Sequence, residues 1–468
     1  MHGIPRLTLS AVRGGGGKTT LAIGVAAAWR RQGKRVAVFK KGPDFIDAGW
    51  LGAAAGRSCY NLDPFLMDEA VIMRSFAVHT ADADIAVIEG NRGLYDGVDE
   101  SGTYSTARLA KLIGSPVVLV MDCTKCTGTV GAVVLGLKMY DPGVALSAVI
   151  LNNVSSERHE RVIRRAVEQS AGVPVVGALP RLGRHEFPER HMGLMPYHEH
   201  PDVEQAIDTT ADLVSKYVDL GALVEIAGRV QVAALHTEEY RDVAATQPDQ
   251  AHPAIGVIQD RAFQFYYPDN LEALEREGAR IVKINALSDR GLPEIDALYI
   301  GGGFPETQAA ELAANESFSR SLREKVGSGL PVYAECGGLI YLGRSLRVGD
   351  RTYPMTNVLP ADFVLEKRPQ AHGYTVIEVE RQNPFFEVGA VFKGHEFHYS
   401  RIVNTEVLDN AAFNMRRGVG INGCKDGLVK GNVLGTYTHL HALAVPEWAW
   451  RMVQRASEFA GLRRKDMQ

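Results

Sequence analysis

Short apolar runs alternate with helix-length segments over the first 180 residues. The runs with the length of strands are residues 7–10, 36–39, 85–89, 117–121, 148–151 and 173–176. Strands separated by helices are typical of a parallel sheet that carries helices on both faces. The pattern therefore predicts a doubly wound α/β domain in the first half of the chain.

A second alternation follows a polar segment that has no clear periodicity. Its predicted strands are residues 255–258, 280–284, 297–300 and 331–333, with helices at 270–277 and 307–314 between them. The polar segment, residues 236–253, ends in His-Pro and is predicted to be a linker. Two domains, 1–235 and 254–468, also suit a chain of 468 residues better than one core would. The expected class is α/β in both halves.

The composition of the chain argues against several classes of protein. The formal net charge of -4, with dispersed Lys and Arg, gives no basic field that would attract nucleic acid. No signal peptide and no apolar run of about 18 residues is present, which predicts a cytoplasmic protein without a membrane segment. Five cysteines are few and odd in number, which favours a reducing compartment over a disulfide framework.

A glycine-rich segment connects the first predicted strand to a helix. It reads Val-Arg-Gly-Gly-Gly-Gly-Lys-Thr-Thr over residues 12–20 and has the context of a phosphate-binding loop, although Val12 stands where the strict pattern has its first glycine. Backbone N–H groups and the helix N-terminus bind phosphates, Lys18 reaches the terminal phosphates, and Thr19 can ligate Mg²⁺. The alternative is a purely structural glycine turn. The predicted ATP-binding residues of the loop are Gly15, Gly17, Lys18, Thr19 and Thr20.

Acidic residues follow two of the next predicted strands. Asp44 and Asp47 come after residues 36–39, while Glu89 ends the strand at 85–89 and Asp96 follows it. Acids after successive parallel strands converge on the carboxyl edge of the sheet, where they can complete a magnesium site with Thr19. For any one acid the alternative is a solvated loop carboxylate.

A cysteine in the second half has the setting of a nucleophile. Cys336 follows a predicted strand and precedes a glycine pair and a helix, which is a tight elbow that exposes a thiol at the sheet edge. The N–H groups of Gly337 and of Gly302 and Gly303, in a loop after another strand, can form an oxyanion hole. His439, near the end of a later strand, is the predicted base. The alternative is a buried, inert cysteine.

Two segments of the first half resemble signature segments of the cobyrinate a,c-diamide synthases. They are Lys-Gly-Pro-Asp-Phe-Ile-Asp at 41–47 and Glu-Gly-x-x-Gly-Leu-Tyr-Asp-Gly at 89–97. The N-terminal domain of that family is similar to dethiobiotin synthetase, which implies a P-loop NTPase-like fold. The resemblance implies that Lys18, Thr19, Asp47 and Glu89 hold Mg-ATP and that Asp44 and Asp96 lie near the phosphates or the substrate carboxylate. It also places Asn152 where the related fold reads adenine.

The second half resembles the cobalamin-biosynthesis branch of the class I glutamine amidotransferases, which implies a flavodoxin-like glutaminase domain. The resemblance includes Gly-His-Glu-Phe-His-Tyr-Ser at 394–400. In most class I members a glutamate two residues beyond the histidine base orients that histidine, and here this place is His441. The sequence leaves the third member of the site open, and a Cys–His dyad is the alternative.

The resemblance covers nearly the whole chain and implies an amide-forming ligase. It implies ATP- and glutamine-dependent amidation of the a and c acetate carboxylates of cobyrinate through acyl phosphates. Hydrogenobyrinate and Ni-sirohydrochlorin are alternative substrates for the same chemistry. A partner-regulating P-loop ATPase is an alternative of another class, but it would not need Cys336 and His439. The oligomeric state is not fixed by the sequence, and a homodimer stays open.

The remaining Cys and His pairs are weak candidates for a metal site. Cys123 and Cys126 form a single Cys-x-x-Cys pair without a second pair at suitable spacing. The histidines at 395, 398, 439 and 441 lack the spacing of a zinc-binding helix. We therefore expect no metal at either place.

Overall fold

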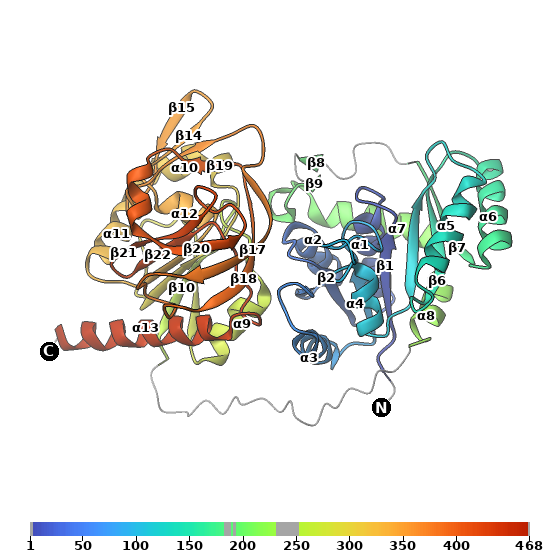
Figure 1. Cartoon of the computed structure of the whole chain (residues 1–468), viewed down its shortest axis with the longest axis horizontal. Helices are drawn as coiled ribbons and strands as arrows, with labels where there is room; N and C mark the ends of the chain where they lie inside the picture. The colour runs from blue at the N-terminus through green and yellow to red at the C-terminus, as the bar shows by residue number, and fades with distance from the viewer. Residues whose placement is uncertain (1–2, 182–188, 191–192, 231–251, 467–468) are drawn as a thin grey trace. The chain divides into compact units, whose positions relative to one another are not determined.

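The computed structural model describes residues 3–181, 189–190, 193–230 and 252–466, which belong to two compact units (Figure 1). The units are Met1–Arg241 and Asp242–Gln468. Residues 236–251 of the predicted linker lie outside the described residues, and the predicted domain boundaries stay predictions. The α/β class predicted for both halves is confirmed. No helix in the described ranges is long and apolar enough to cross a membrane.

The first unit is built on a seven-stranded sheet in which every neighbouring pair is parallel. Burial on both faces explains why its central strands read as continuous apolar runs. In sheet order the strands are β3 (Cys59–Leu62), β2 (Val36–Lys41), β4 (Ile85–Glu89), β1 (Arg6–Ala11), β5 (Val117–Asp122), β6 (Leu146–Val154) and β7 (Val175–Pro180). The predicted doubly wound sheet is confirmed, with β3 as an additional edge strand.

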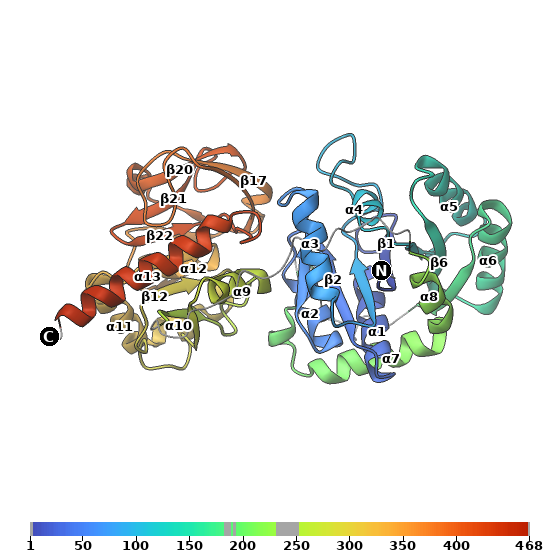
Figure 2. The ribbon, with the colours of Figure 1, turned by 90° about the horizontal axis from the view of Figure 1, so that it is seen from below.

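Helices cover both faces of this sheet. One face packs against α1 (Lys18–Arg31), α2 (Ile46–Ala55), α7 (Val203–Tyr217) and α8 (Leu220–Ala227). The other packs against α3 (Glu69–Thr80), α4 (Thr106–Leu112), α5 (Thr129–Tyr140) and α6 (Glu157–Ala171). Figure 2 shows α1, α2 and α7 together on one side. A short hairpin, β8 (Glu189–Arg190) and β9 (Gly193–Leu194), and the 3₁₀ turn η1 (Tyr197–Glu199) precede α7.

The second unit contains a nine-stranded mixed sheet. Its first five strands are parallel and the remaining pairs are antiparallel. In sheet order they are β11 (Arg280–Ile284), β10 (Ala254–Ile258), β12 (Ala297–Ile300), β13 (Val332–Glu335), β22 (Val433–Thr436), β21 (Lys425–Lys430), β20 (Ala411–Arg417), β17 (Ala371–Val379) and β18 (Val391–His398). A four-stranded sheet adds β15 (Arg351–Pro354), β14 (Ser345–Val348), β16 (Asp362–Leu365) and β19 (Ser400–Ile402).

Helices also cover both faces of the nine-stranded sheet. One face packs against α10 (Ala309–Ala314), α11 (Glu316–Gly327) and α12 (Gly337–Leu342), with the 3₁₀ turn η3 (Pro305–Gln308) before α10. The other packs against α9 (Pro268–Arg276) and the long α13 (Pro446–Asp466), which lies along the sheet in Figures 1 and 2. A further 3₁₀ turn, η4 (Thr405–Asn410), precedes β20.

Helix α13 is anchored by one tryptophan. The Trp448 side chain is 0% exposed, and its ring lies 5.2 Å from the ring of Tyr299 and 5.5 Å from that of Tyr333. Two residues further on, Trp450 is 46% exposed. The same residue type on one helix is therefore buried at one position and solvated at the other.

We predict that Trp448→Ala lowers the free energy of unfolding of the second unit by about 3–5 kcal/mol, because it leaves a large cavity against the sheet. Trp450→Ala should cost less than about 1 kcal/mol. Urea unfolding followed by circular dichroism measures both. Equal losses in the two variants would contradict the packing of α13 on the sheet.

Candidate active sites

The glycine-rich segment forms a turn between β1 and the first residue of α1. Gly15 and Gly17 have φ of 71° and 89°, which side chains other than glycine rarely adopt. A Cβ atom on Gly17 would lie 2.3 Å from Nδ2 of Asn152, which donates to the carbonyl of Gly16 at 3.2 Å. Backbone conformation and packing both require glycine at position 17.

Lys18 and Thr19 open α1 beside the carboxyl ends of β2 and β4. Thr19 Oγ1 lies 2.5 Å from Oε1 of Glu89 and 3.4 Å from Oδ2 of Asp47, which are 70 and 28 residues away in the chain. Lys18 is 7% exposed and its Nζ donates to the carbonyl of Arg13 at 3.3 Å. Burial lowers the pKa of Lys18, and the nearby Glu89 opposes this effect. The structure thus brings together the hydroxyl and the two acids predicted as a magnesium site.

Lys40 is a member of this cluster that the sequence analysis missed. Its Nζ lies 2.6 Å from Oδ2 of Asp47 and 3.0 Å from Oε1 of Glu89, and its side chain is 3% exposed. Burial disfavours the ammonium charge, but the carboxylates of Asp47 and Glu89 outweigh burial and raise the pKa of Lys40 above its usual value. Lys40 therefore neutralises part of the charge that the two acids bring together.

Glu89 keeps one oxygen free for a further ligand. Its carboxylate is 0% exposed, and Oε2 has no hydrogen-bond partner among the described residues. Burial and the neighbouring Asp47 raise the pKa of Glu89 to about 7, although Lys40 and Thr19 act in the opposite direction. A buried acceptor without a donor fits a cation that the protein does not itself supply.

The remaining predicted residues of this site lie around the loop. Asp44 Oδ1 accepts the N–H of Asp47 at 2.8 Å, and burial, with Asp47, raises the pKa of Asp44 to about 6. Asp96 Oδ2 accepts the N–H of Gly93 at 2.8 Å. Thr20 is half-buried in the first turn of α1. Asn152 contacts the glycine loop, as described above, and its predicted contact with adenine stays a prediction.

Cys336 stands on a sharp turn between β13 and α12. It has φ of 47° and ψ of -99°, a strained conformation for a residue with a side chain. Its N–H donates to the carbonyl of Thr436 at 2.7 Å, which ties the turn to β22. Burial raises the pKa of the Cys336 thiol well above its usual value, the Glu306 carboxylate adds to this effect, and the N–H of Gly337 opposes it. The thiol therefore needs a partner that takes its proton.

The two glycine loops of the predicted oxyanion hole lie against each other. A Cβ on Gly337 would lie 3.0 Å from the backbone N of Gly303, and Gly338 donates to the carbonyl of Gly301 at 3.1 Å. A Cβ on Gly302 would lie 2.4 Å from Cε1 of His439. The loop at 301–303 thus contacts both the turn of the nucleophile and the predicted base.

His439 is held by its backbone and its ring. Its N–H and carbonyl exchange hydrogen bonds of 2.8 and 3.1 Å with His395, and the two rings stack with centroids 4.8 Å apart. Its Nδ1 lies 3.4 Å from Oε2 of Glu335. His441, in the place where most class I members have their orienting glutamate, instead lies with Nε2 3.3 Å from Oδ2 of Asp269.

Comparison with known proteins agrees with this geometry. Residues 7–195 match the model described as the CobQ/CobB/MinD/ParA nucleotide binding domain, and residues 254–446 match the CobB/CobQ-like glutamine amidotransferase domain. The chain is 38% identical over 447 residues to the cobyrinate a,c-diamide synthase of Magnetococcus marinus, covering 95% of this chain and 96% of that protein. The synthases of Archaeoglobus fulgidus and Methanosarcina acetivorans are 41% and 39% identical over 97% and 98% of this chain and 98% and 97% of their own lengths.

The chain belongs to the cobyrinate a,c-diamide synthase family. The resemblance stated from the sequence segments is thereby confirmed, together with the class of a glutamine-dependent, amide-forming ligase that binds nucleotide. The roles of the individual site residues stay predictions.

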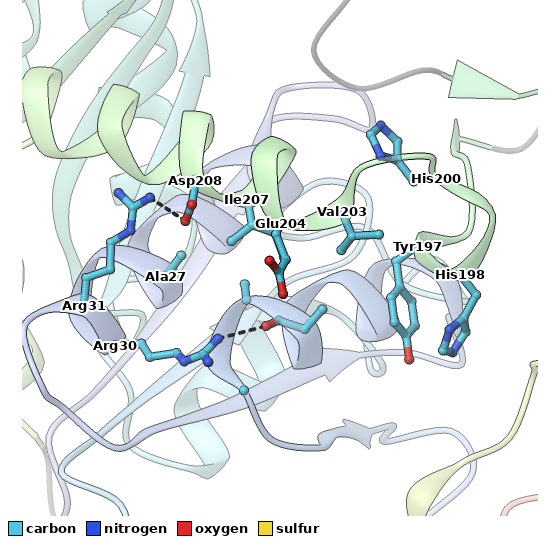
Figure 3. Close-up of a pocket in the computed structure, with 13 residues that line it drawn as sticks. Ala27, Arg30, Arg31, Tyr197, His198, His200, Val203, Glu204, Ile207 and Asp208 are labelled. Carbon is cyan, nitrogen blue, oxygen red and sulfur yellow. Dashed lines mark hydrogen bonds and ion pairs between the residues drawn. The ribbon is translucent and has the colours of Figure 1, made fainter.

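The first unit also has a groove that lies away from the phosphate loop. The groove, of about 780 Å³, lies between the C-terminal part of α1, the end of α2 and the start of α7 (Figure 3). Its arginines are engaged, because Arg31 pairs with Asp208 at 2.5 Å and Arg30 donates to the carbonyl of Ala53 at 3.4 Å. Twelve residues of α1, roughly 18 Å, separate Arg30 from Lys18. This groove is therefore distinct from the phosphate loop.

We predict that Gly17→Ala raises the Kd for ATP about 5- to 150-fold, because a strained positive φ alone costs about 1–3 kcal/mol. The added methyl group would also displace Asn152 from the loop. Calorimetric titration with ATP measures the change. The control is Gly14→Ala in the same loop, where a Cβ meets no atom within 4 Å and where a much smaller change is expected. Equal affinities of the Gly17→Ala variant and the unmodified protein would contradict the assigned loop.

Proposed function

We propose that this chain amidates the a and c acetate carboxylates of cobyrinate, using ATP and the amide nitrogen of glutamine. The proposal is supported by one observation above all. A single chain, similar over nearly its whole length to cobyrinate a,c-diamide synthases, holds two sites. One is an acid cluster beside a phosphate loop, and the other is a strained cysteine whose turn packs on a glycine loop that contacts a histidine. A partner-regulating ATPase would need only the first of these sites.

The first unit activates the substrate carboxylate. A carboxylate does not accept ammonia directly because its oxygen is a poor leaving group, so the γ-phosphoryl group of ATP is transferred to it and yields an acyl phosphate and ADP. Lys18 and the loop N–H groups hold the phosphates. Lys40, buried beside the acids, is a second positive charge at the same edge of the sheet. Asp44 and Asp96 are proposed to lie near the reacting groups.

The acid cluster suits Mg²⁺. Oxygen ligands are available from Thr19, Asp47 and Glu89, and Oε2 of Glu89 has no donor within the described part of the chain. Held by these residues, a divalent ion would supply positive charge against the phosphates. Because the ammonium group of Lys40 contacts the carboxylates of both Asp47 and Glu89, we expect one of two changes when such an ion binds. Lys40 either moves away from the two carboxylates or shares them with the ion.

The second unit supplies ammonia. The thiolate of Cys336 attacks the side-chain amide carbon of glutamine, with the N–H groups of Gly303 and Gly337 near the developing oxyanion. His439 takes the thiol proton and returns it to the leaving nitrogen, which departs as ammonia and leaves a glutamyl thioester. Water then releases glutamate. The ammonia displaces phosphate from the acyl phosphate and forms the amide.

Hydrogenobyrinate and Ni-sirohydrochlorin are alternative substrates for the same chemistry. Incubation of the protein with each tetrapyrrole, ATP, Mg²⁺ and glutamine, followed by mass spectrometry, distinguishes unmodified, singly amidated and doubly amidated products.

We also propose a cytoplasmic location, because all five cysteines are unpaired thiols and both co-substrates are cytoplasmic metabolites.

The first prediction of the proposal concerns activation. Lys18→Ala should lower amidation by at least about 100-fold with glutamine and with ammonium salt alike, because acyl phosphate formation precedes nitrogen entry. Glutamine hydrolysis measured separately should persist. Normal product formation from ammonium salt would remove the role assigned to the phosphate loop.

The second prediction concerns the nitrogen source. Cys336→Ala should abolish amidation from glutamine, a loss of at least about 100-fold, because the thioester route closes. Amidation from ammonium salt should survive and should increase with pH, because only unprotonated ammonia is a nucleophile. The measurement is product formation with each nitrogen source. A Cys336→Ala variant that still uses glutamine would overturn the glutaminase assignment.

A further inference from the structure

The residue directly before the nucleophile carries a buried carboxylate. Glu335 ends β13, is 1% exposed and precedes Cys336 in the chain. Its Oε2 lies 3.4 Å from Nδ1 of His439, the predicted base. A hydrophobic strand does not need an acid here, and burying a carboxylate without compensation is costly.

Three donors fix the orientation of this carboxylate. The hydroxyl of Tyr299 donates to Oε2 at 3.2 Å, while the hydroxyl of Tyr333 and the N–H of Leu440 donate to Oε1 at 3.2 and 3.1 Å. Leu440 follows His439 directly, so Glu335 contacts the backbone beside the base as well as its ring. The carboxylate cannot turn away from His439 without breaking these hydrogen bonds.

The other acidic and basic groups around the base have different partners. Asp269 lies 3.3 Å from Nε2 of His441, and Glu396 accepts the N–H groups of Val419 and Gly420 at 2.6 and 2.8 Å. Burial, with His439 and His441 nearby, lowers the pKa of His395, so the ring stacked on His439 is neutral near pH 7. Glu335 thus places a carboxylate against Nδ1 of His439 without a competing cation from that ring.

We propose that Glu335 is the positioning residue of the glutaminase site, which completes a Cys336–His439–Glu335 triad whose first and third members are consecutive in the chain. The inference rests on the proposed glutaminase function. In this structure Nδ1 of His439 lies 3.4 Å from Oε2 of Glu335 without a hydrogen bond between them. A small rotation of the ring lets Glu335 accept the Nδ1–H, keep the proton on Nδ1 and leave Nε2 to take the thiol proton. The imidazolium formed while sulfur bonds to the amide carbon is stabilised by the carboxylate, until its proton leaves with the departing ammonia.

This arrangement differs from the one in most class I members, where the orienting glutamate stands two residues beyond the histidine. Here that place holds His441, whose partner is Asp269. The triad uses β13 for its acid instead of the segment after β22. The proposal therefore predicts that a change at Glu335, and not one at the pair of His441 and Asp269, disables the base.

The test is Glu335→Gln in the full-length protein, which keeps the shape of the side chain and removes its charge. We expect kcat for glutamine hydrolysis to fall at least about 100-fold, since loss of the orienting carboxylate in a comparable triad costs about 10⁴-fold. The KM for glutamine should stay within about threefold, and amidation from ammonium salt within about twofold, because binding and the first unit are untouched.

A second readout separates positioning from packing. The rate of Cys336 alkylation by iodoacetamide, measured against pH, reports the thiolate that His439 stabilises. Glu335→Gln should move this profile to higher pH, and Glu335→Asp should recover part of the lost activity because the charge returns. The matched control is Asp269→Asn, another buried carboxylate paired with a histidine, which should leave the alkylation profile in place.

Each outcome either supports or overturns the role proposed for Glu335. A Glu335→Gln variant with kcat for glutamine within threefold of the unmodified protein, or with an unchanged alkylation profile, overturns it. If that variant does not fold, Glu335→Asp is judged alone. Its shorter side chain withdraws the carboxylate from Nδ1 and should lower kcat for glutamine at least about tenfold, and a kcat within threefold of the unmodified protein overturns the inference. An unmodified protein that hydrolyses no glutamine would refute the proposed function itself, whereas equal hydrolysis by unmodified protein and variant refutes only the role of Glu335.

Discussion

The pairing of β2 with β4 sets the charges of the first site. In this register Lys40 lies directly opposite Glu89, so the parallel sheet itself brings an ammonium group against a carboxylate that is 0% exposed. An uncompensated buried carboxylate would cost several kcal/mol. Thr19 from α1 and Asp47 from α2 meet the same pair. A shift of one residue in this register would send Lys40 to the opposite face and leave Glu89 without its cation.

The balance of charge in this cluster leaves negative charge that a further cation would compensate. One ammonium group faces two carboxylates, and an oxygen of Glu89 has no donor among the described residues. The protein alone therefore stabilises the acids only in part, and a bound ion would complete the compensation. The raised pKa of Glu89, about 7, has the same origin, because burial and Asp47 together outweigh the attraction of Lys40. The stability of the folded protein and the binding of a cation at this edge of the sheet thus depend on the same charges, those of Lys40, Asp47 and Glu89.

Much of the fold was predictable because parallel strands buried on both faces are continuous apolar runs. β3 was missed, since it is four residues long and contains Asn61. The strands β14–β21 were also missed, because they lie in antiparallel pairs whose exposed positions interrupt the apolar pattern, as in the burial of β17. Lys18, Thr19, Asp47 and Glu89 were found from loop chemistry and from the rule that strand ends converge. The distances that join them come from sheet register, which periodicity does not encode.

The residues that sequence reasoning passed over share one property. Lys40 and Glu335 both lie inside buried strands, at positions where an apolar pattern favours reading any residue as part of the core. Yet a long charged side chain in a continuously buried strand can persist only with a fixed partner of opposite charge or with several donors. Each of the two therefore signals a specific partner, which is Glu89 for Lys40 and, in the proposed triad, the His439 imidazole for Glu335. A charged residue that interrupts a strand at its carboxyl end is thus evidence for a site, even when the sequence does not reveal the partner.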